Sequence, residues 1–260
     1  MDWVHIAPLG VVRESPVCPE CALRTGEAER VMPISYKRHR FPAEVIRYAV
    51  WLYFRFALSL RDVEDLLAER GIDVSYETIR CWTRKFGRAF ARNLRRSRPS
   101  PTATWHLDEM VARIGGKRMF LWRAVDGEGE VLDMLVQKRR NKAAALKLLR
   151  KLLRGQGTRP EAIVTDGLGS YRSALSALGL ARRHRPGRLR ANNRAENSHL
   201  PLRKREHVLQ RFKSQGSAQL FASTHAAFYN AFNVQRHLFS RGSFRRRRAQ
   251  AMTLWAAATA

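Results

Sequence analysis

The sequence predicts a chain in two folded parts, an all-α segment followed by a mixed α/β domain. Apolar residues recur every three or four positions between residues 42 and 96, which is the period of helices with one buried face. Residues 97–103 contain prolines, serines and an arginine and are predicted to be a linker. After them the pattern changes to strand-like runs separated by glycine turns. Hydrophobic residues make up 45% of the 260 residues, enough to build a core in both parts.

The N-terminal residues 1–36 are predicted to form a weakly structured extension, because they lack a sustained apolar period and are slightly acidic. Met32 is a candidate natural start of translation; mass spectrometry of protein made from the native gene tests this, and an intact residue-1 terminus would refute it. A single CxxC pair, Cys18 to Cys21, has no second pair to complete four zinc ligands, so we expect an unmetallated loop. The alternative is a zinc site completed by His5 and His39.

Three helices are predicted between residues 42 and 96. The capping and terminating residues are Ser59, Gly71 and Ser75. In the third helix Ile79, Trp82 and Phe86 are expected to face the core, with base stacking as the alternative for Trp82. The outer face of that helix is basic and is expected to contact DNA through Arg80, Arg84, Lys85 and Arg88. Two helices joined by a glycine turn, the second with a basic face, predict a helix-turn-helix domain over residues 37–96.

Residues 104–235 are predicted to form the mixed α/β domain. Three strand-like runs come first, separated by glycine-containing hairpin turns. The runs are Thr102–Ile114, Arg118–Val125 and Val131–Val136. A helix (141–154), a short apolar strand that ends at Asp166 and a second helix (171–180) follow. This order is similar to that of ribonuclease-H-like domains, and residues 236–260 are expected to form a basic helical tail.

The charge of the chain indicates a polyanionic partner. It has 49 Lys and Arg against 22 Asp and Glu, and residues 181–260 alone hold 17 basic and 2 acidic residues. Double-stranded DNA is therefore favoured over a membrane surface. The run Arg245 to Arg248 is expected to contact phosphates without sequence preference, with a solvated helix face as the alternative. No apolar run nears the roughly 20 residues of a membrane span, and three cysteines favour the reducing cytoplasm.

Three acids stand out in this basic chain: Asp108, Asp166 and Glu196. Asp108 lies on the first predicted strand, Asp166 ends a later strand and Glu196 follows in an Arg-rich stretch expected to be helical. If the fold brings them together, they supply the hard oxygen ligands that Mg²⁺ or Mn²⁺ prefers, and two such ions roughly 4 Å apart catalyse phosphodiester chemistry. Taken singly, each acid has an ordinary alternative, as a strand-edge acid, a helix cap or a salt-bridge partner.

The neighbours of these acids are weaker candidates. Glu109 is expected on the opposite strand face from Asp108, at the surface or supporting the metal ligands. His106 shares the face of Asp108, where orienting a ligand and packing as a strand histidine are both open. His199 lies three residues after Glu196 on the same predicted helical face, which makes it a candidate DNA contact beside the site.

Several short motifs resemble those of bacterial insertion-sequence transposases of the DDE class, and most closely insertion-sequence family six. The resemblance runs from about Tyr36 to the C-terminus, about 220 of the 260 residues. The motifs are Trp105 to Glu109 (WH-x-DE), Arg123 to Asp126 (RAVD), Arg139 to Ala144, Thr165-Asp166, Asn192 to Glu196 (NN-x-x-E) and Phe212 to Ser214 (FKS).

The resemblance implies a role for each acid: Asp108 would bridge two metal ions, while Asp166 and Glu196 would each hold one. Asp166 and Glu196 are 30 residues apart, closer than is usual in the family, which a shortened loop would explain.

The family also carries a basic residue seven positions after the glutamate, and here this is Arg203, with Lys204 beside it. It would contact the DNA end, because a guanidinium clamps phosphate well. Pro201 falls between Glu196 and Arg203 and is expected to kink the helix, so that Lys204 or Arg205 would be the alternative contact.

The function implied by the resemblance is DNA transposition in the bacterial cytoplasm, at the nucleoid. The protein would bind the ends of an insertion sequence, nick them to expose 3′-hydroxyl groups and join these to target DNA with two Mg²⁺ or Mn²⁺ ions. Because two ends react together, a homodimer or larger assembly is expected. The alternatives are a catalytically inactive helix-turn-helix protein derived from a transposase, and a ribonuclease-H-like nuclease that cuts without joining.

Overall fold

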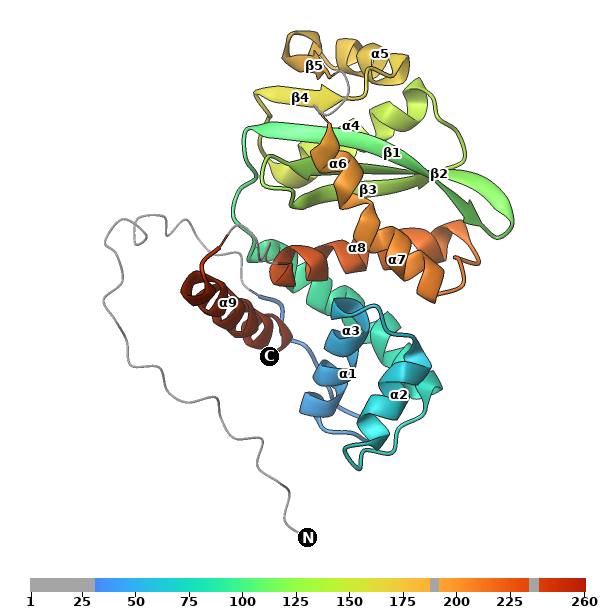
Figure 1. Ribbon diagram of the computed structural model, residues 1–260, viewed down its shortest axis with the longest axis vertical. Helices are drawn as coiled ribbons and strands as arrows, with labels where there is room; N and C mark the ends of the chain where they lie inside the picture. The colour runs from blue at the N-terminus through green and yellow to red at the C-terminus, as the bar shows by residue number, and fades with distance from the viewer. Residues whose placement is uncertain (1–30, 188–191, 234–238) are drawn as a thin grey trace. The chain divides into compact units, whose positions relative to one another are not determined.

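The computed structural model describes residues 31–187, 192–233 and 239–260 (Figure 1). The predicted loop at Cys18 and Cys21, and His5, lie outside these residues. The helices are α1 (Ala43–Arg55), α2 (Leu60–Ala68), α3 (Tyr76–Arg96), α4 (Lys142–Gln156), α5 (Gly169–Ala177), α6 (Asn193–Ser198), α7 (Leu200–Val208), α8 (Gln215–Phe232) and α9 (Arg241–Thr259), with a 3-10 turn η2 (Ala181–Arg183). The strands are β1 (Thr104–Ile114), β2 (Lys117–Asp126), β3 (Val131–Gln137), β4 (Ala162–Thr165) and β5 (His184–Pro186).

Helices α1, α2 and α3 pack around a core that residues of α8 and α9 complete. The Ser59 hydroxyl accepts the Asp62 N–H at 3.1 Å and the Asp62 carboxylate accepts the Ser59 N–H at 2.7 Å, which closes a capping box at the start of α2. Trp82 on α3 is 3% exposed, and its ring meets Phe41 edge-on at 5.3 Å between centroids. Trp82 therefore packs in the core, as predicted, and is not presented to a flipped base.

Helix α9 packs against α3. The Trp255 ring meets Phe90 edge-on at 5.1 Å between centroids, and the fully buried Asn93 amide donates to the Ala258 carbonyl at 2.9 Å. Arg245 to Arg248 stay exposed on α9. Within the segment predicted to be a basic helical tail, Arg241–Thr259 form α9, and apolar residues of this helix join the core of the helical part.

The second part is a five-stranded mixed sheet in the order β3-β2-β1-β4-β5. Strands β1, β2 and β3 pair antiparallel, whereas β4 joins β1 and β5 joins β4 in parallel. Helices α4 and α5 cover one face and α6, α7 and α8 the other; Figure 1 shows α6 in front of β1 and α4 behind the sheet. The predicted fold class, a ribonuclease-H-like mixed sheet preceded by helices, is confirmed. Strand β5 was not predicted, because it is three residues long and has no apolar run.

The helix after Glu196 breaks at His199. Pro201 falls in the first turn of α7, where its missing N–H costs no helical hydrogen bond. Glu196 on α6 and Arg203 on α7 therefore belong to separate helices, and the interruption lies at His199, two residues before Pro201, where the backbone angles remain αR.

Arg205 on α7 is 2% exposed and joins the two parts of the fold. Its guanidinium donates to the carbonyls of Phe56 at 2.9 Å and Leu58 at 2.6 Å, both in the loop between α1 and α2. The alternative prediction that Arg205 contacts DNA is wrong, because burial in this contact leaves none of its side chain free for phosphate.

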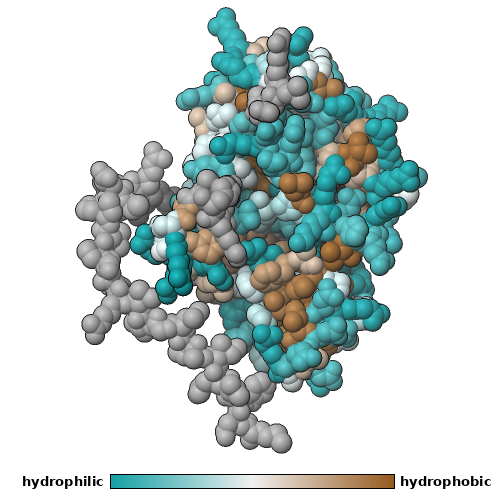
Figure 2. Space-filling model, in the orientation of Figure 1, coloured by the Kyte–Doolittle hydropathy of each residue, from teal (hydrophilic) through white to brown (hydrophobic). Residues whose placement is uncertain are grey.

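The surface in Figure 2 is largely hydrophilic, with smaller hydrophobic areas between the charged side chains. This agrees with a chain of net charge +27. Among the described residues, the helices are all too short or too polar to cross a membrane.

His225 on α8 gives the fold a pH-dependent stability. Its ring stacks between Phe221 and Tyr229, and burial, aided by positive charge from Arg123, lowers its pKa to about 3. The unfolded chain takes up this proton near pH 6.5 but the folded chain only near pH 3, so acid favours unfolding. We expect His225 to lower the free energy of unfolding by about 1.4 kcal/mol per pH unit across that interval.

Replacement His225→Phe keeps the ring stack and removes the titrating group. Urea unfolding at several pH values between 7 and 4 should show a shallower loss of stability in the variant than in the wild type. Parallel curves for the two proteins would contradict this assignment.

Candidate active site

The parallel pairing of β1 with β4 brings two of the predicted acids together. His106 pairs with Val164, and the same register continued by two residues sets Asp108 beside Asp166 just past the end of β4. Gly167, with φ of +85°, turns the chain directly after Asp166. The Asp166 carboxylate accepts the Leu168 N–H at 3.1 Å, which fixes it at the entrance to α5.

The carboxylate of Glu109 joins these two. One oxygen from each of Asp108, Glu109 and Asp166 lies within 4.8 Å of the others. Glu109 points to the opposite face from Asp108, as predicted, and accepts the Tyr171 hydroxyl of α5 at 2.8 Å. Its side chain is only 2% exposed, so the expected surface position is wrong. The sequence feature that could have placed Glu109 in the site is its position directly after Asp108, on the strand that carries the site.

Arg140, just before α4, bridges the acidic group. Its guanidinium donates to the Glu109 carboxylate and, at 3.2 Å, to Asp166. Burial raises the pKa of Glu109, while the Tyr171 hydrogen bond and the Arg140 charge act in the other direction. A cation held between two of the three carboxylates marks a strongly negative site. These hard oxygen donors fit a divalent ion such as Mg²⁺ or Mn²⁺.

Glu196 lies outside the group of three carboxylates that the described residues form. It is exposed on α6, one turn before His199. His199 is 4% exposed, and its Nε2 lies 3.1 Å from Asp108 Oδ2. Burial lowers the pKa of His199, against the opposing effect of the Asp108 hydrogen bond, so we assign a neutral ring with the proton on Nε2. His199, predicted to contact DNA, thus orients Asp108.

Asn192 anchors α6 to the sheet. Its buried amide donates to the Leu107 carbonyl at 2.8 Å, next to Asp108, and Ala195 is fully buried below it. His106 is 9% exposed, and burial lowers its pKa. His106 therefore packs as a strand histidine. Asn192 of the NN-x-x-E motif thus holds the helix that carries Glu196 against β1.

The comparisons with known proteins agree with this geometry. Residues 102–235 match the family model DDE_Tnp_IS240, described as a DDE domain. The chain belongs to this DDE family of insertion-sequence transposases. It is 31% identical over 144 residues to the transposase for insertion sequence-like element IS431mec of Staphylococcus aureus, covering 55% of this chain and 64% of the relative. The same values hold for the transposase of insertion sequence element IS257 in transposon Tn4003 of Staphylococcus aureus.

The chain thus spans less than two thirds of the length of these relatives. Among solved structures, the simian T-cell lymphotropic virus intasome in complex with PP2A regulatory subunit B56 gamma has a chain with a TM-score of 0.38 and 17% identity, covering 53% of this chain and 51% of its own.

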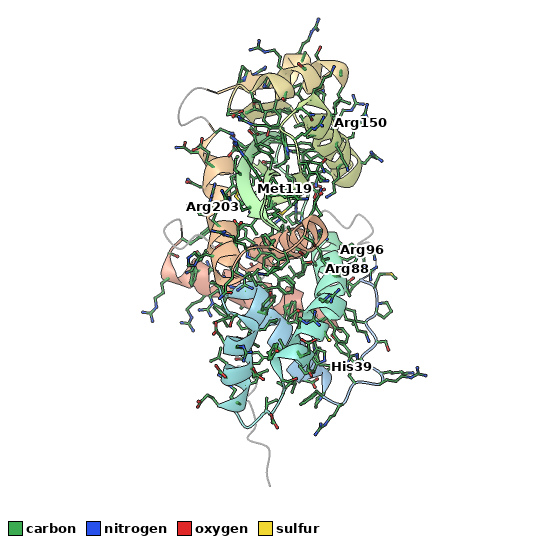
Figure 3. The ribbon with its side chains drawn as sticks, turned by 90° about the vertical axis from the view of Figure 1, so that its right-hand side faces the viewer. His39, Arg88, Arg96, Met119, Arg150 and Arg203 are labelled. Atoms are coloured by element: carbon green, nitrogen blue, oxygen red, sulfur yellow. The ribbon has the colours of Figure 1, made fainter. Side chains whose placement is uncertain are left out.

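One set of predicted DNA contacts of this DDE-family chain lies on α3. Arg84, Lys85 and Arg88 are exposed there, and Figure 3 labels Arg88 and His39. Lys85 Nζ is 2.8 Å from His39 Nε2. Arg80 is paired with Glu77 one turn away, which partly neutralises it. Three of the four predicted cations are therefore exposed on one helix face.

The second set lies on α7. Arg203 and Lys204 are both exposed, and Figure 3 labels Arg203. The Arg203 N–H donates to the carbonyl of His199, which is the N-cap of α7 and also holds Asp108. Both exposed cations therefore lie on the helix that directly follows His199.

Proposed function

We propose that the protein is a DNA transposase that nicks the ends of an insertion sequence and joins the exposed 3′-hydroxyl groups to target DNA. The observation that carries this proposal is the group of Asp108, Glu109 and Asp166 on neighbouring strands of a DDE domain. A basic chain has no structural need for three converging carboxylates, two of which share the single positive charge of Arg140. A cation site beside a phosphate-binding surface explains both features.

Asp108, Asp166 and Glu196 are the residues that would hold two divalent ions. Such ions, when bound, activate the attacking oxygen and stabilise the leaving oxygen of a phosphodiester. His199 keeps the Asp108 carboxylate oriented through the hydrogen bond at 3.1 Å. Arg140, whose side chain is 41% exposed, would give up its two ion pairs when a divalent cation occupies the site. Glu109, fixed by Tyr171, supports the other acids from the opposite face.

The DNA contacts follow from the exposed cations. The outer face of α3, with Arg84, Lys85 and Arg88, would bind the element ends in the manner of a recognition helix. Arg203 and Lys204 on α7 would hold the phosphates next to the reacting bond. Two ends must be held together, so the working form is at least a homodimer, acting on nucleoid DNA in the cytoplasm of a bacterium.

A strand-transfer assay tests the proposal. The protein is mixed with labelled duplex carrying an element end and with an unlabelled target duplex, and joined products are counted with and without Mg²⁺. Joined products that require Mg²⁺ or Mn²⁺ and vanish with chelator are expected. Cut products without joined ones would identify a nuclease, and end binding without either product would identify an inactive DNA-binding protein.

A further inference from the structure

Five exposed cations surround the end of the sheet where β1 turns into β2. Arg113, Lys117 and Arg118 come from the hairpin, and Lys138 and Arg139 follow the end of β3; we refer to these five residues as the basic tip. The pairing of β3 with β2 places the two segments side by side, because Gln137 pairs with Phe120, two residues after Arg118. The basic tip is thus one surface built from two segments of the sheet.

Acids in the described part of the chain do not pair with the basic tip. Among residues 31–187, 192–233 and 239–260, none of its five members forms an ion pair within 4.0 Å. Arg113 and Arg118 stand directly opposite each other across the hairpin. Like charges in that position destabilise a sheet. Arg118 lies over the ring of Phe120, 5.5 Å from its centroid, which leaves its charge without an acidic partner. A hairpin that retains such a pair of like charges indicates an anionic partner from another molecule.

The tip is held rigidly. Gly115 and Gly116 turn the hairpin with φ of +55° and +77°. The Gly115 N–H donates to the Phe212 carbonyl at 2.9 Å, and a Cβ at Gly115 would lie 2.7 Å from the Lys213 carbonyl oxygen. The hairpin is therefore fixed to the loop between α7 and α8, so its cations are placed in advance of binding.

The same surface leads to the acidic site. Arg113 lies four residues beyond Glu109 on the same face of β1, a distance of about 14 Å along a strand. Val111 between them is 42% exposed, so the helices of the described residues leave this position of the sheet open. On the other side Arg139 immediately precedes Arg140, which bridges Glu109 and Asp166. About 14 Å corresponds to roughly four base pairs of duplex at about 3.4 Å each.

We propose that the basic tip is the surface that binds the backbone of the target duplex, a few base pairs from the reacting phosphodiester. This inference rests on the proposed function. The element ends require sequence recognition, for which α3 is available, whereas a target of any sequence is held through phosphates alone. Long Lys and Arg side chains on a bare strand surface provide contacts of that kind.

The test replaces three tip cations together, Arg113→Gln, Lys117→Gln and Arg118→Gln. A matched control removes three exposed cations from α4, Lys147→Gln, Arg150→Gln and Arg154→Gln; Figure 3 labels Arg150 and also Met119, which follows Arg118 on β2. Both variants lose the same charge. The tip variant should be at least as stable as the wild type in urea, because it also loses the repulsion between Arg113 and Arg118.

Three measurements are compared: nicking of an element end without target, joining of a pre-nicked end to a separate duplex, and the salt dependence of binding to duplex that lacks the end sequence. For the tip variant we expect nicking within about twofold of wild type and joining at low target concentration reduced at least about tenfold. Its salt slope should fall by roughly 0.9 for each lost phosphate contact. The α4 variant should resemble wild type in all three.

Full joining by the tip variant, or equal losses in the two variants, would overturn the proposal while leaving the proposed function intact. Failure of the wild type to nick or join would instead refute the proposed function, and the salt slopes would still decide whether the tip binds duplex. Loss of binding to phosphatidylserine vesicles with an unchanged salt slope on DNA would assign the tip to a membrane surface and overturn the inference.

Discussion

Replacement of Asp108 by asparagine is expected to abolish end joining, by about 10³-fold or more. Asn keeps the size of the side chain and can still accept the hydrogen bond from His199 Nε2, which lies 3.1 Å away in the wild type. It removes the charge that would bridge two cations, and metal ions contribute several kcal/mol of transition-state stabilisation. Each 1.4 kcal/mol is about a factor of ten in rate, so a loss of this size follows. Joined product in the Mg²⁺-dependent assay is the measurement.

Binding of the element end serves as the control for Asp108→Asn. The variant should bind end DNA at least as tightly as wild type, because a negative charge near phosphate has been removed. Its free energy of unfolding should also be preserved. Joining at the wild-type rate by a folded, DNA-binding Asp108→Asn protein would show that Asp108 has no part in the reaction.

The same assay decides which glutamate completes the site. Glu196→Gln should lose joining as completely as Asp108→Asn if Glu196 is the third ligand. Glu109→Gln should cost less, because Gln can still accept the Tyr171 hydroxyl, which holds this side chain at 2.8 Å. The reverse order of activities would assign the third position to Glu109, whose oxygen already lies within 4.8 Å of both aspartates.

The sequence was most informative where local chemistry decides the structure. The capping residues Ser59 and Ser75 begin α2 and α3 because their hydroxyls accept N–H groups in the first turn. The glycine pair at 115 and 116 turns the first hairpin because both residues adopt positive φ. The strand position of Asp108 and the strand-end position of Asp166 followed from the same kind of local pattern, and their approach followed from the predicted fold.

Contacts between distant segments could not be predicted in this way. The sequence around Arg140 does not indicate that its guanidinium pairs with both Glu109 and Asp166. These contacts depend on how the segment before α4 passes the end of β4. Arg205 has the sequence context of a phosphate-binding residue, beside Arg203 and Lys204, and yet is buried. Only the packing of α7 against the loop after α1 decides that its guanidinium meets carbonyls in place of DNA.

Loss of Arg205 is expected to cost about 2–5 kcal/mol of unfolding free energy in Arg205→Ala. Two carbonyls, of Phe56 and Leu58, lose the donor that satisfies them, and an unsatisfied buried acceptor costs about 1–3 kcal/mol. The guanidinium also lies 4.7 Å from the Tyr53 ring and 5.3 Å from the Phe221 ring, contacts that Ala removes. Urea unfolding at pH 7 measures the change, with Arg203→Ala, on the exposed side of α7, expected within about 0.5 kcal/mol of wild type.

Replacement of Arg205 is also expected to impair the reaction at the active site. His199 is the N-cap of α7, so a loosened α7 displaces the residue that orients Asp108 as well as the neighbouring Glu196. Arg205→Lys keeps the charge but cannot reproduce a planar group that stacks on rings and donates twice to the loop. In conditions where this variant remains folded, we expect end binding close to wild type and joining reduced about tenfold. Equal losses of binding and joining would instead mean that Arg205 only stabilises the fold.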